Sequence, residues 1–446
     1  MPFATINPAT GQTEKTFPAH TAAEVEARLQ QAADTFAERS RHLITAAELM
    51  EGEGPDMARV LTTEMGKTFA AARGEVAKCA MALRWFAEHA EALLADEPVT
   101  TTATRSYVHY QPIGPVLAIM PWNFPLWQVI RFAAPALMVG NVGLLKHASN
   151  VPQTALLLED LFHRAGLPDG AFTNLFVDSK DVAAIIEDPR IAAVTLTGSE
   201  RAGMSVAATA GHALKKSVLE LGGSDPFIVL PSADLASTVR TAVNARVQNN
   251  GQSCIAAKRF IVTEPIADEF LRLFTEAMDA LVVGDPFDPA TDVGPIVTEA
   301  QRDELLAQVE EARSQGATVH MHPKVPDGPG WWLAPTVLSG VTPDMPVAGE
   351  EIFGPVAIVQ RVPDLTAAIA VANATTFGLG SSVWTTDEAE QRRCIEEIEA
   401  GAVFVNAMVA STPELPFGGI KRSGFGRELS ELGIKEFTNA KTVFIT

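Results

Sequence analysis

One cysteine of this chain lies in a loop whose composition suits a reactive thiol. Cys254 ends the segment Gly251-Gln252-Ser253-Cys254, and the 446 residues contain only two other cysteines. An acid, Glu220, lies upstream in a turn rich in glycine. A thiol nucleophile paired with a carboxylate that activates water is a recurrent arrangement in covalent catalysis. A buried and inert cysteine is the alternative, and this loop alone fits both interpretations.

Polar residues also follow several apolar segments that are typical of strands. They are therefore expected at the carboxyl edge of a sheet, where α/β folds bind their ligands. The Asn123 amide can donate to an oxyanion, although an Asn in a proline-bounded turn is an equal alternative. Lys146 suits a ribose or a phosphate, unless it is an ordinary exposed lysine. Gly198 and Ser199 open a helix whose first N–H groups can bind a phosphate, but the complete dinucleotide fingerprint is missing.

A second acid, Glu351, precedes a Gly-Pro turn, with Phe353 as a possible stacking surface. A helix cap or a solvated charge is the alternative for this acid. Cys79 and Cys394 lie in helical patterns, so we expect them to pack in the core. The nine histidines show no metal-ligand spacing, and no metal site is predicted.

Short apolar segments alternate with helical patterns over most of the chain. This alternation predicts the α/β class, with two Rossmann-like parallel-sheet domains and ligand bound between them. Helices are expected up to about residue 95, from Pro152 to just before Gly166, and over 266–281. The expected strands are 116–120, 143–146, 174–177, 193–197, 260–262, 356–359, 382–384 and 402–405.

The segments 99–111 and 441–446 have the character of exposed antiparallel strands. We expect them to form a small antiparallel oligomerisation ribbon outside the two sheets, which joins copies of the chain into a homodimer or homotetramer. Solvent-covered edge strands are the alternative.

The composition limits the classes of partner. A net charge of −20 argues against nucleic acid, whose phosphates need a basic surface. The most apolar stretch, 116–145, is interrupted by prolines and polar residues, so no membrane span is expected. The first residues lack a signal-peptide pattern, and cysteine is scarce. Both observations favour a cytoplasmic protein.

Taken in order, these motifs resemble the aldehyde dehydrogenase superfamily over nearly the whole chain. The resemblance implies oxidation of an aldehyde to a carboxylic acid through a cysteine thiohemiacetal and a thioester. It also implies a cofactor-binding domain over 1–97 and 113–222, a catalytic domain over 223–427, and an oligomerisation segment over 98–112 and 428–446. The matching motifs are Pro121-Trp122-Asn123-Phe124-Pro125, Lys146, Thr197-Gly198-Ser199, Glu220-Leu221-Gly222-Gly223, Gly251-Gln252-Ser253-Cys254, Glu351-Ile352-Phe353-Gly354-Pro355 and Pro416-Phe417-Gly418-Gly419-Ile420-Lys421.

The resemblance assigns a role to single residues. Cys254 would attack the aldehyde, the Asn123 amide and the Cys254 backbone N–H would hold the oxyanion, and Glu220 would activate the hydrolytic water. The implied cofactor contacts are Trp122, Lys146, Ser149, Gly198, Ser199, Leu221, Glu351 and Phe353.

Cofactor choice depends on Ser149. Relatives that prefer NAD commonly carry an acid three residues after the family lysine, where its carboxylate binds the adenosine 2′-hydroxyl and repels a 2′-phosphate. This chain has a neutral serine there, close to Lys146. The prediction is therefore NADP, with NAD as the weaker cofactor.

Within the family, the chain looks most like short bacterial NADP-dependent succinate-semialdehyde dehydrogenases, especially over 125–131 and 254–260. Arg131 occupies a position that those enzymes use for the substrate carboxylate. Ser411 and Thr412 would add hydroxyl contacts. Gln248 is a departure, because many of these enzymes carry a second arginine at that position.

Three other functions remain open at this point. A broad-specificity aliphatic or aromatic aldehyde dehydrogenase would need the same catalytic residues. A thiol esterase could use Cys254 and Glu220 without any redox step. A catalytically silent relative would normally lack the thiol, the acid or the cofactor contacts, and this chain retains all of them.

Overall fold

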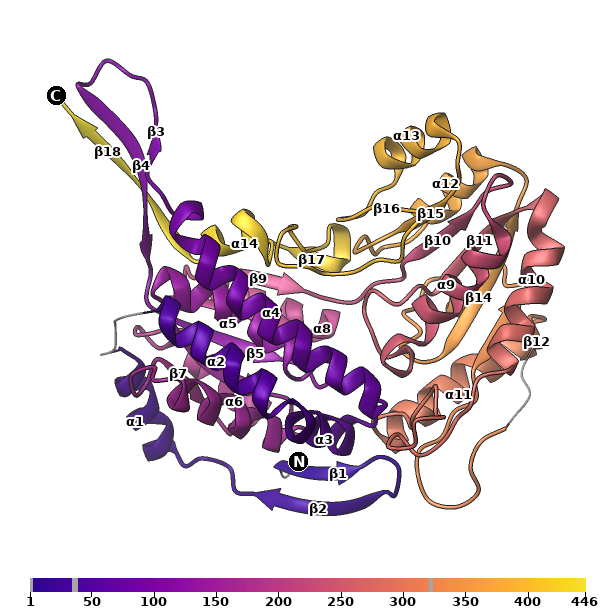
Figure 1. Ribbon diagram of the computed structural model, residues 1–446, viewed down its shortest axis with the longest axis horizontal. Helices are drawn as coiled ribbons and strands as arrows, with labels where there is room; N and C mark the ends of the chain where they lie inside the picture. The colour runs from indigo at the N-terminus through magenta and orange to yellow at the C-terminus, as the bar shows by residue number, and fades with distance from the viewer. Residues whose placement is uncertain (1–2, 34–38, 321–323) are drawn as a thin grey trace.

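Two large β-sheets organise the chain in the computed structural model, which describes residues 3–33, 39–320 and 324–446. Figure 1 shows the two sheets side by side, each with helices packed against it, and a narrow ribbon that projects from one end of the molecule. The predicted α/β class is confirmed: two mainly parallel sheets and a small antiparallel one are present.

The six-stranded sheet contains β5 (Pro115–Met120), β6 (Val142–His147), β7 (Phe172–Asn174), β8 (Ala193–Thr197), β9 (Lys216–Glu220) and β17 (Gly424–Phe425). Its order is β17-β9-β8-β5-β6-β7, with only β17 antiparallel to its neighbour. Side chains alternate across a strand, so Val116 and Ala118 of β5 enter one core cluster while Leu117 enters the opposite one. Burial on both faces explains why these strands are continuous apolar runs.

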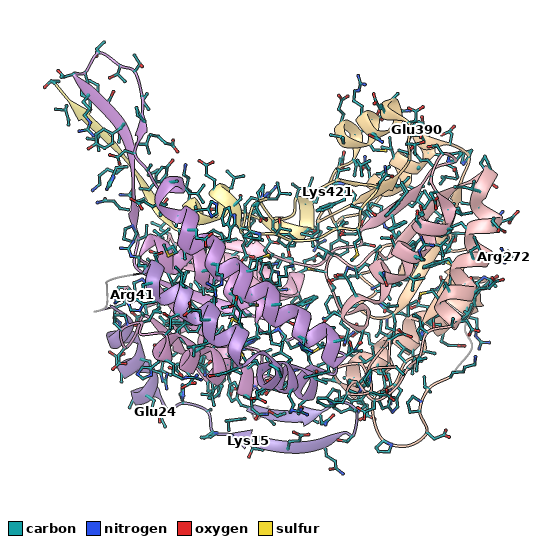
Figure 2. All side chains as sticks on the ribbon, viewed as in Figure 1. Lys15, Glu24, Arg41, Arg272, Glu390 and Lys421 are labelled. Carbon is teal, nitrogen blue, oxygen red and sulfur yellow. The ribbon has the colours of Figure 1, made fainter. Side chains whose placement is uncertain are left out.

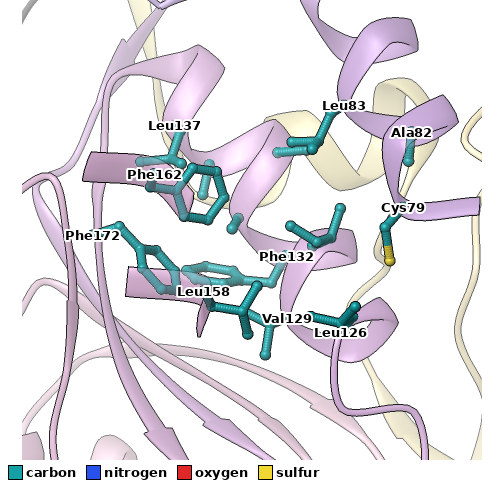
Figure 3. Packing of buried hydrophobic residues seen from close by; sticks show 14 of the residues in the cluster. Cys79, Ala82, Leu83, Leu126, Val129, Phe132, Leu137, Leu158, Phe162 and Phe172 are labelled. Atoms are coloured by element: carbon teal, nitrogen blue, oxygen red, sulfur yellow. The ribbon is translucent and has the colours of Figure 1, made fainter. Parts of the chain in front are cut away.

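One face of this sheet is covered by a large cluster of buried side chains from six helices. Figure 3 shows Cys79 in this cluster with Phe132 and Phe162, which confirms its predicted packing role. The opposite face packs against three further helices. The first group is α2 (Ser40–Gly52), α3 (Gly54–Met65), α4 (Phe69–Leu93), α5 (Trp127–Val139), α6 (Pro152–Arg164) and α14 (Ser430–Glu436). The second group is α1 (Ala22–Ala33), α7 (Val182–Glu187) and α8 (Glu200–His212).

The seven-stranded sheet contains β10 (Pro226–Val229), β11 (Arg259–Thr263), β12 (Thr318–His320), β13 (Thr336–Ser339), β14 (Val356–Val362), β15 (Ser382–Trp384) and β16 (Phe404–Val405). Its order is β12-β13-β14-β11-β10-β15-β16, and only β12 runs antiparallel to its neighbour. Charged residues such as Arg272 and Glu390 lie on the outside of its helices (Figure 2). These helices are α9 (Leu235–Val247), α10 (Glu264–Asp279), α11 (Glu299–Ser314), α12 (Leu365–Asn373) and α13 (Glu388–Glu397).

The projecting ribbon is a three-stranded sheet of β3 (Glu97–Pro98), β4 (Arg105–Pro112) and β18 (Thr438–Ile445). β18 is antiparallel to β4 over its full length, and the C-terminus lies at the tip of the ribbon (Figure 1). The two segments predicted to be exposed strands therefore pair with each other. Phe444 near the tip is 53% exposed.

The main differences from the sequence predictions lie near the predicted domain junction. Glu220 is the last residue of β9 and not part of a turn, because β9 is hydrogen-bonded on both sides, to β8 and to β17. β17 belongs to the six-stranded sheet, although its residues lie within the range 223–427 predicted for the catalytic domain. A short N-terminal hairpin, β1 (Phe3–Asn7) with β2 (Gln12–Phe17), was not predicted. The domain boundaries themselves stay predictions.

No helix among the described residues is both long enough and apolar enough to span a membrane.

Candidate active site

The loop that carries Cys254 is held rigidly by buried side chains. It follows α9 and the short helix η2 (Gln248–Gly251), in which Asn249 and Asn250 have φ angles of 55° and 58°. Asn250 Nδ2 donates to the carbonyl oxygens of Gly66 (2.9 Å) and Pro295 (3.1 Å). These bonds compensate for the left-handed backbone, which most side chains avoid. The thiol is therefore presented from a fixed position.

Lys258 holds the cysteine loop through hydrogen bonds to its backbone. Its fully buried Nζ donates to the carbonyl oxygens of Ser253 (2.8 Å) and Cys254 (2.5 Å). It also lies 3.6 Å from Glu351 Oε1, which supplies the opposite charge. Sequence reasoning assigned no role to this lysine. The only signal was its place between the cysteine loop and a buried strand.

Cys254 is half-buried, whereas Cys79 and Cys394 are buried. Burial raises the pKa of the Cys254 thiol to about 12, although the positive charges of Lys258 and Arg131 act to lower it. Removal from water disfavours the thiolate, so the resting cysteine is a protonated thiol at neutral pH. The Cys254 thiol must therefore lose its proton when it acts as a nucleophile.

Asn123 lies directly against the cysteine loop. It follows β5, and its side-chain Nδ2 donates to the carbonyl oxygen of Gln252, 3.2 Å away. In return, Asn249 Nδ2 donates to the Asn123 carbonyl oxygen at 2.8 Å. The structure thus brings the predicted oxyanion donor together with the predicted nucleophile, although 131 positions (254 − 123) separate them in the sequence.

Glu220 is buried at the end of β9, and neither of its carboxylate oxygens has a hydrogen-bond partner among the described residues. Burial raises its pKa well above the ordinary value, and the negative charge of Glu428 raises it further. The sequence did not indicate Glu428, because it lies far from Glu220 along the chain and approaches it only in the folded structure. A carboxylate of raised pKa can accept a proton near neutral pH.

Arg131 does not present a free guanidinium. It is buried on α5, where it forms an ion pair with Glu428 and donates from Nη2 to Thr197 Oγ1 at 3.2 Å. Its guanidinium also lies 4.6 Å from the centre of the Phe417 ring. A substrate carboxylate would have to compete with Glu428 for this arginine, so substrate binding by Arg131 stays a prediction that the geometry does not favour.

The predicted cofactor residues lie at the carboxyl edge of the six-stranded sheet. Lys146 is in β6 and Gly198 follows β8, while Ser149 and Trp122 lie in the loops after β6 and β5. Burial lowers the pKa of Lys146, and no carboxylate lies within ion-pairing distance of it among the described residues. An unpaired lysine at this edge fits a ribose or phosphate group of a dinucleotide.

Gly198 and Ser199 connect β8 to α8. The Gly198 N–H donates to the Glu220 carbonyl oxygen at 2.9 Å, so it is already engaged within the sheet. Ser199 is the N-cap of α8, with its Oγ 3.4 Å from the Ala202 nitrogen. The remaining N–H groups of the first turn are the ones that could meet a phosphate.

The remaining cofactor candidates form a second group. Trp122 and Phe353 pack edge to face, with ring centres 5.7 Å apart. Glu351 Oε1 accepts from the Gly223 N–H at 3.0 Å. Leu221 packs against Gly203 of α8, where a Cβ would lie 2.6 Å from the leucine side chain. Residues predicted from separate motifs therefore gather around the strand ends, as a cofactor site requires.

The side chains of two of the four predicted substrate residues form no hydrogen bond within the described part of the chain. Thr412 is half-buried, and Gln248 has a buried Nε2 without a hydrogen-bond partner among the described residues. Ser411, in contrast, is buried, and its Oγ accepts from Trp127 Nε1 at 3.0 Å and from Lys78 Nζ at 2.8 Å. Lys78 of α4 is a residue that sequence reasoning missed.

The chain is similar to known proteins over nearly its whole length. The family model described as the aldehyde dehydrogenase family matches residues 1–443. Succinate-semialdehyde dehydrogenase [NADP(+)] of Mycobacterium avium is 58% identical over 100% of this chain and 97% of that protein. Succinate-semialdehyde dehydrogenase [NADP(+)] 1 of Mycobacterium tuberculosis is 59% identical over the full length of both. A solved structure of succinic semialdehyde dehydrogenase from Streptococcus pyogenes in complex with NADP+ superimposes with a TM-score of 0.97 at 38% identity, covering 99% of each chain.

Proposed function

Since the chain belongs to the aldehyde dehydrogenase family, we propose that it oxidises succinate semialdehyde to succinate with NADP as the cofactor. The observation that carries the proposal is the hydrogen bond from the Asn123 amide to Gln252, in the loop that carries Cys254. Relatives at 58–59% identity that bear the name succinate-semialdehyde dehydrogenase [NADP(+)] support the choice of substrate and cofactor.

The first step is the attack of the Cys254 sulfur on the aldehyde carbon. A C–S bond forms, the carbonyl electron pair moves to oxygen, and the thiol proton passes to solvent water. The oxyanion is stabilised by the Asn123 amide and the Cys254 backbone N–H, because these donors are fixed before charge develops. Lys258 holds the loop during this step.

The bound nicotinamide cofactor supplies the hydride acceptor that converts the thiohemiacetal to a thioester. Lys146 and Glu351 would bind its ribose hydroxyls, and Ser149 would place no repelling carboxylate next to a 2′-phosphate near Lys146. The first turn of α8 would face the pyrophosphate. The Trp122 and Leu221 side chains would line the same site.

Hydrolysis then releases the acid. Glu220 takes a proton from water, the water oxygen attacks the thioester carbon, and the C–S bond breaks to leave a thiolate. The proton taken by Glu220 then returns to the sulfur through solvent, which restores the thiol. In the structure the pKa of Glu220 is raised by burial and by the negative charge of Glu428, so this carboxyl can accept the proton near neutral pH.

The test is an initial-rate panel with succinate semialdehyde and butanal, each with NADP and NAD. The proposal expects the highest kcat/KM with succinate semialdehyde and NADP, and loss of reduced-cofactor formation in Cys254→Ala. Equal kcat/KM for both aldehydes would support a broad-specificity aldehyde dehydrogenase instead. Ester hydrolysis without any reduced cofactor would support the thiol esterase.

Assembly and location follow as parts of the same proposal. The three-stranded ribbon leaves an exposed edge and the exposed Phe444, which a second copy of the chain could cover, giving a homodimer or homotetramer. All three cysteines are free, and a catalytic thiol needs a reducing compartment, which favours the cytoplasm. Light scattering of the purified protein would test the assembly.

A further inference from the structure

The segment 124–127 joins Asn123 to helix α5, and a carboxylate from another helix holds its backbone. Glu75 of α4 is buried, and its Oε1 accepts from the N–H groups of Leu126 and Trp127, each at 2.9 Å. These N–H groups lie at the start of α5, where the helix itself offers no partner. Leu126 is the N-cap of α5, and its side chain cannot accept a hydrogen bond. Glu75 therefore supplies the cap that the local sequence lacks.

Lys67 completes this contact. Its fully buried Nζ forms an ion pair with Glu75 and lies 4.2 Å from the centre of the Phe124 ring. Helices α4 and α5 also contribute many apolar side chains to the same core cluster. A buried ion pair stabilises a core no better than apolar side chains of similar size. Packing of α4 against α5 therefore does not account for the pair, whereas its contacts with the segment after Asn123 do.

A second buried group holds the same segment from the sheet. His147, the last residue of β6, has its Nε2 2.9 Å from the carbonyl oxygen of Pro125. Burial lowers the pKa of His147 to about 4, so the ring is neutral at pH 7 and carries one proton. Because a carbonyl oxygen can only accept, this proton is on Nε2, and Nδ1 accepts from the Ala148 N–H at 2.9 Å. Three consecutive residues, 125–127, are thus held through their backbone.

Asn123 itself is tied to the cysteine loop by one of its two amide protons. Its Nδ2 donates to the Gln252 carbonyl oxygen at 3.2 Å, and the second proton on the same nitrogen remains for an oxyanion. Stabilisation of an oxyanion depends on donors that are fixed before the charge develops, within about 0.5 Å of the productive geometry. The backbone that carries Asn123 is fixed in this way by the contacts to 125–127.

We propose that Glu75 and His147 are positioning residues for the oxyanion donor. Their hydrogen bonds to the backbone of 125–127 direct the second amide proton of Asn123 at the carbonyl oxygen of the aldehyde that Cys254 attacks. The inference rests on the proposed function, because it takes Asn123 as the oxyanion donor. It adds two residues that touch neither substrate nor cofactor and that set the rate of thiol addition through Asn123.

The test compares two double variants, both of which remove the ion pair without leaving a single charge buried. Lys67→Met with Glu75→Gln keeps a side-chain oxygen for the two N–H groups, whereas Lys67→Met with Glu75→Leu removes it. The first turnover at saturating aldehyde, followed as reduced cofactor after rapid mixing, should be about 10- to 100-fold slower in the leucine variant, with little change in KM. Glu88→Leu, which removes an exposed carboxylate from α4, should react like the wild type.

A double-mutant cycle with Asn123→Ala separates positioning from a structural role. If Glu75 acts through Asn123, the glutamine and leucine variants react at the same rate once the Asn123 amide is absent. Alkylation of Cys254 by iodoacetamide needs no oxyanion donor, so its rate should also be the same in the two variants. An undiminished difference in the Asn123→Ala background would overturn the inference, because Glu75 would then act on the fold of the site.

His147 gives an independent pair of variants, which decides the matter if the Lys67 and Glu75 variants do not fold. His147→Gln keeps an N–H that can reach the Pro125 carbonyl oxygen, whereas His147→Phe fills the site without a donor. The first turnover should be about tenfold slower in the phenylalanine variant than in the glutamine variant. Equal rates in this pair would show that His147 does not position Asn123.

Failure of the inference and failure of the proposed function are distinguishable. All rates are measured with the aldehyde, succinate semialdehyde or butanal, that the wild type oxidises faster. A wild type that prefers butanal would overturn the proposed substrate, and the same variants would still decide the positioning role with butanal. A wild type that prefers succinate semialdehyde, with equal rates in both pairs of variants, would overturn the positioning role alone.

Discussion

Lys258 donates from its buried side chain to the carbonyl oxygen of Cys254, with Nζ and O 2.5 Å apart. The same lysine contributes the largest of the charges that lower the pKa of the Cys254 thiol. One side chain therefore fixes the backbone of the nucleophile and favours its ionised form.

We expect Lys258→Met to slow alkylation of Cys254 by iodoacetamide at pH 8 by about tenfold, because the thiol pKa rises when the positive charge is removed. The rate is followed by mass spectrometry of the Cys254 peptide. Lys180→Met, which removes an exposed charge, is the matched control and should react like the wild type. Equal rates in the two variants would show that Lys258 does not act on the thiol.

In the wild type, a thiol pKa of about 12 predicts a steep pH dependence of alkylation. Between pH 7 and pH 10 the thiolate fraction, and with it the rate, should increase about tenfold per pH unit. Cys254→Ser provides the background from the other two cysteines. A plateau close to neutral pH would contradict a protonated resting cysteine.

Glu220→Gln should slow hydrolysis of the thioester more than its formation, because the amide cannot accept the proton from water. Rapid-mixing measurements should then show a burst of reduced cofactor of about one equivalent per active site, followed by slow turnover. If the variant shows no burst and the first turnover is slowed equally, Glu220 acts before the thioester.

Glu428→Gln probes the charge next to Glu220. Burial and the Glu428 charge both raise the pKa of Glu220, so the neutral amide should lower that pKa. Glu220 then ionises at lower pH, and the acidic limb of the kcat profile should move to lower pH. A shift in the opposite direction would mean that release of Arg131 outweighs the loss of the Glu428 charge.

Ser149→Glu should shift the preference from NADP toward NAD. A carboxylate beside the 2′-phosphate repels it, and we expect the ratio of kcat/KM with NADP over NAD to fall about 10- to 100-fold. Ser149→Gln adds nearly the same volume without a charge, so it separates repulsion from crowding. Similar ratios in both variants would attribute any effect to size.

Gly251→Ala should destabilise the cysteine loop. Gly251 has a φ of +74°, and a Cβ there would lie 2.3 Å from the carbonyl carbon of Gly354. We expect the apparent Tm to fall by about 5 °C or more. Gly52→Ala is the control, since no heavy atom lies within 4 Å of its added Cβ, and its Tm should stay within about 2 °C of the wild type.

Several strands that are buried on both faces could be predicted, although β10 and β13, which are also buried, were missed. Residues 193–197 and 382–384 coincide with β8 and β15, because a continuous apolar run bounded by turn residues has few other interpretations. β9 was missed, since its first residues, Lys216 and Ser217, are polar and partly exposed.

Some residues of the candidate site could be predicted from the sequence, and others could not. Motif residues such as Asn123 and Glu351 could be singled out because they lie at strand ends or next to glycines. Lys78 could not, since its partner Ser411 is 333 positions away and nothing local distinguishes it from an exposed helical lysine. The pairing of Arg131 with Glu428 was hidden for the same reason.

The antiparallel pairing of β17 with β9 has a consequence for synthesis of the chain. Residues 424–425 leave the ribosome only after every strand of the seven-stranded sheet has been made. Until then β9 is an open edge, and the carboxyl end that carries Glu220 is uncovered. The six-stranded sheet therefore cannot be completed until the whole seven-stranded sheet has been synthesised. A nascent chain halted before residue 424 has an edge that other chains can join.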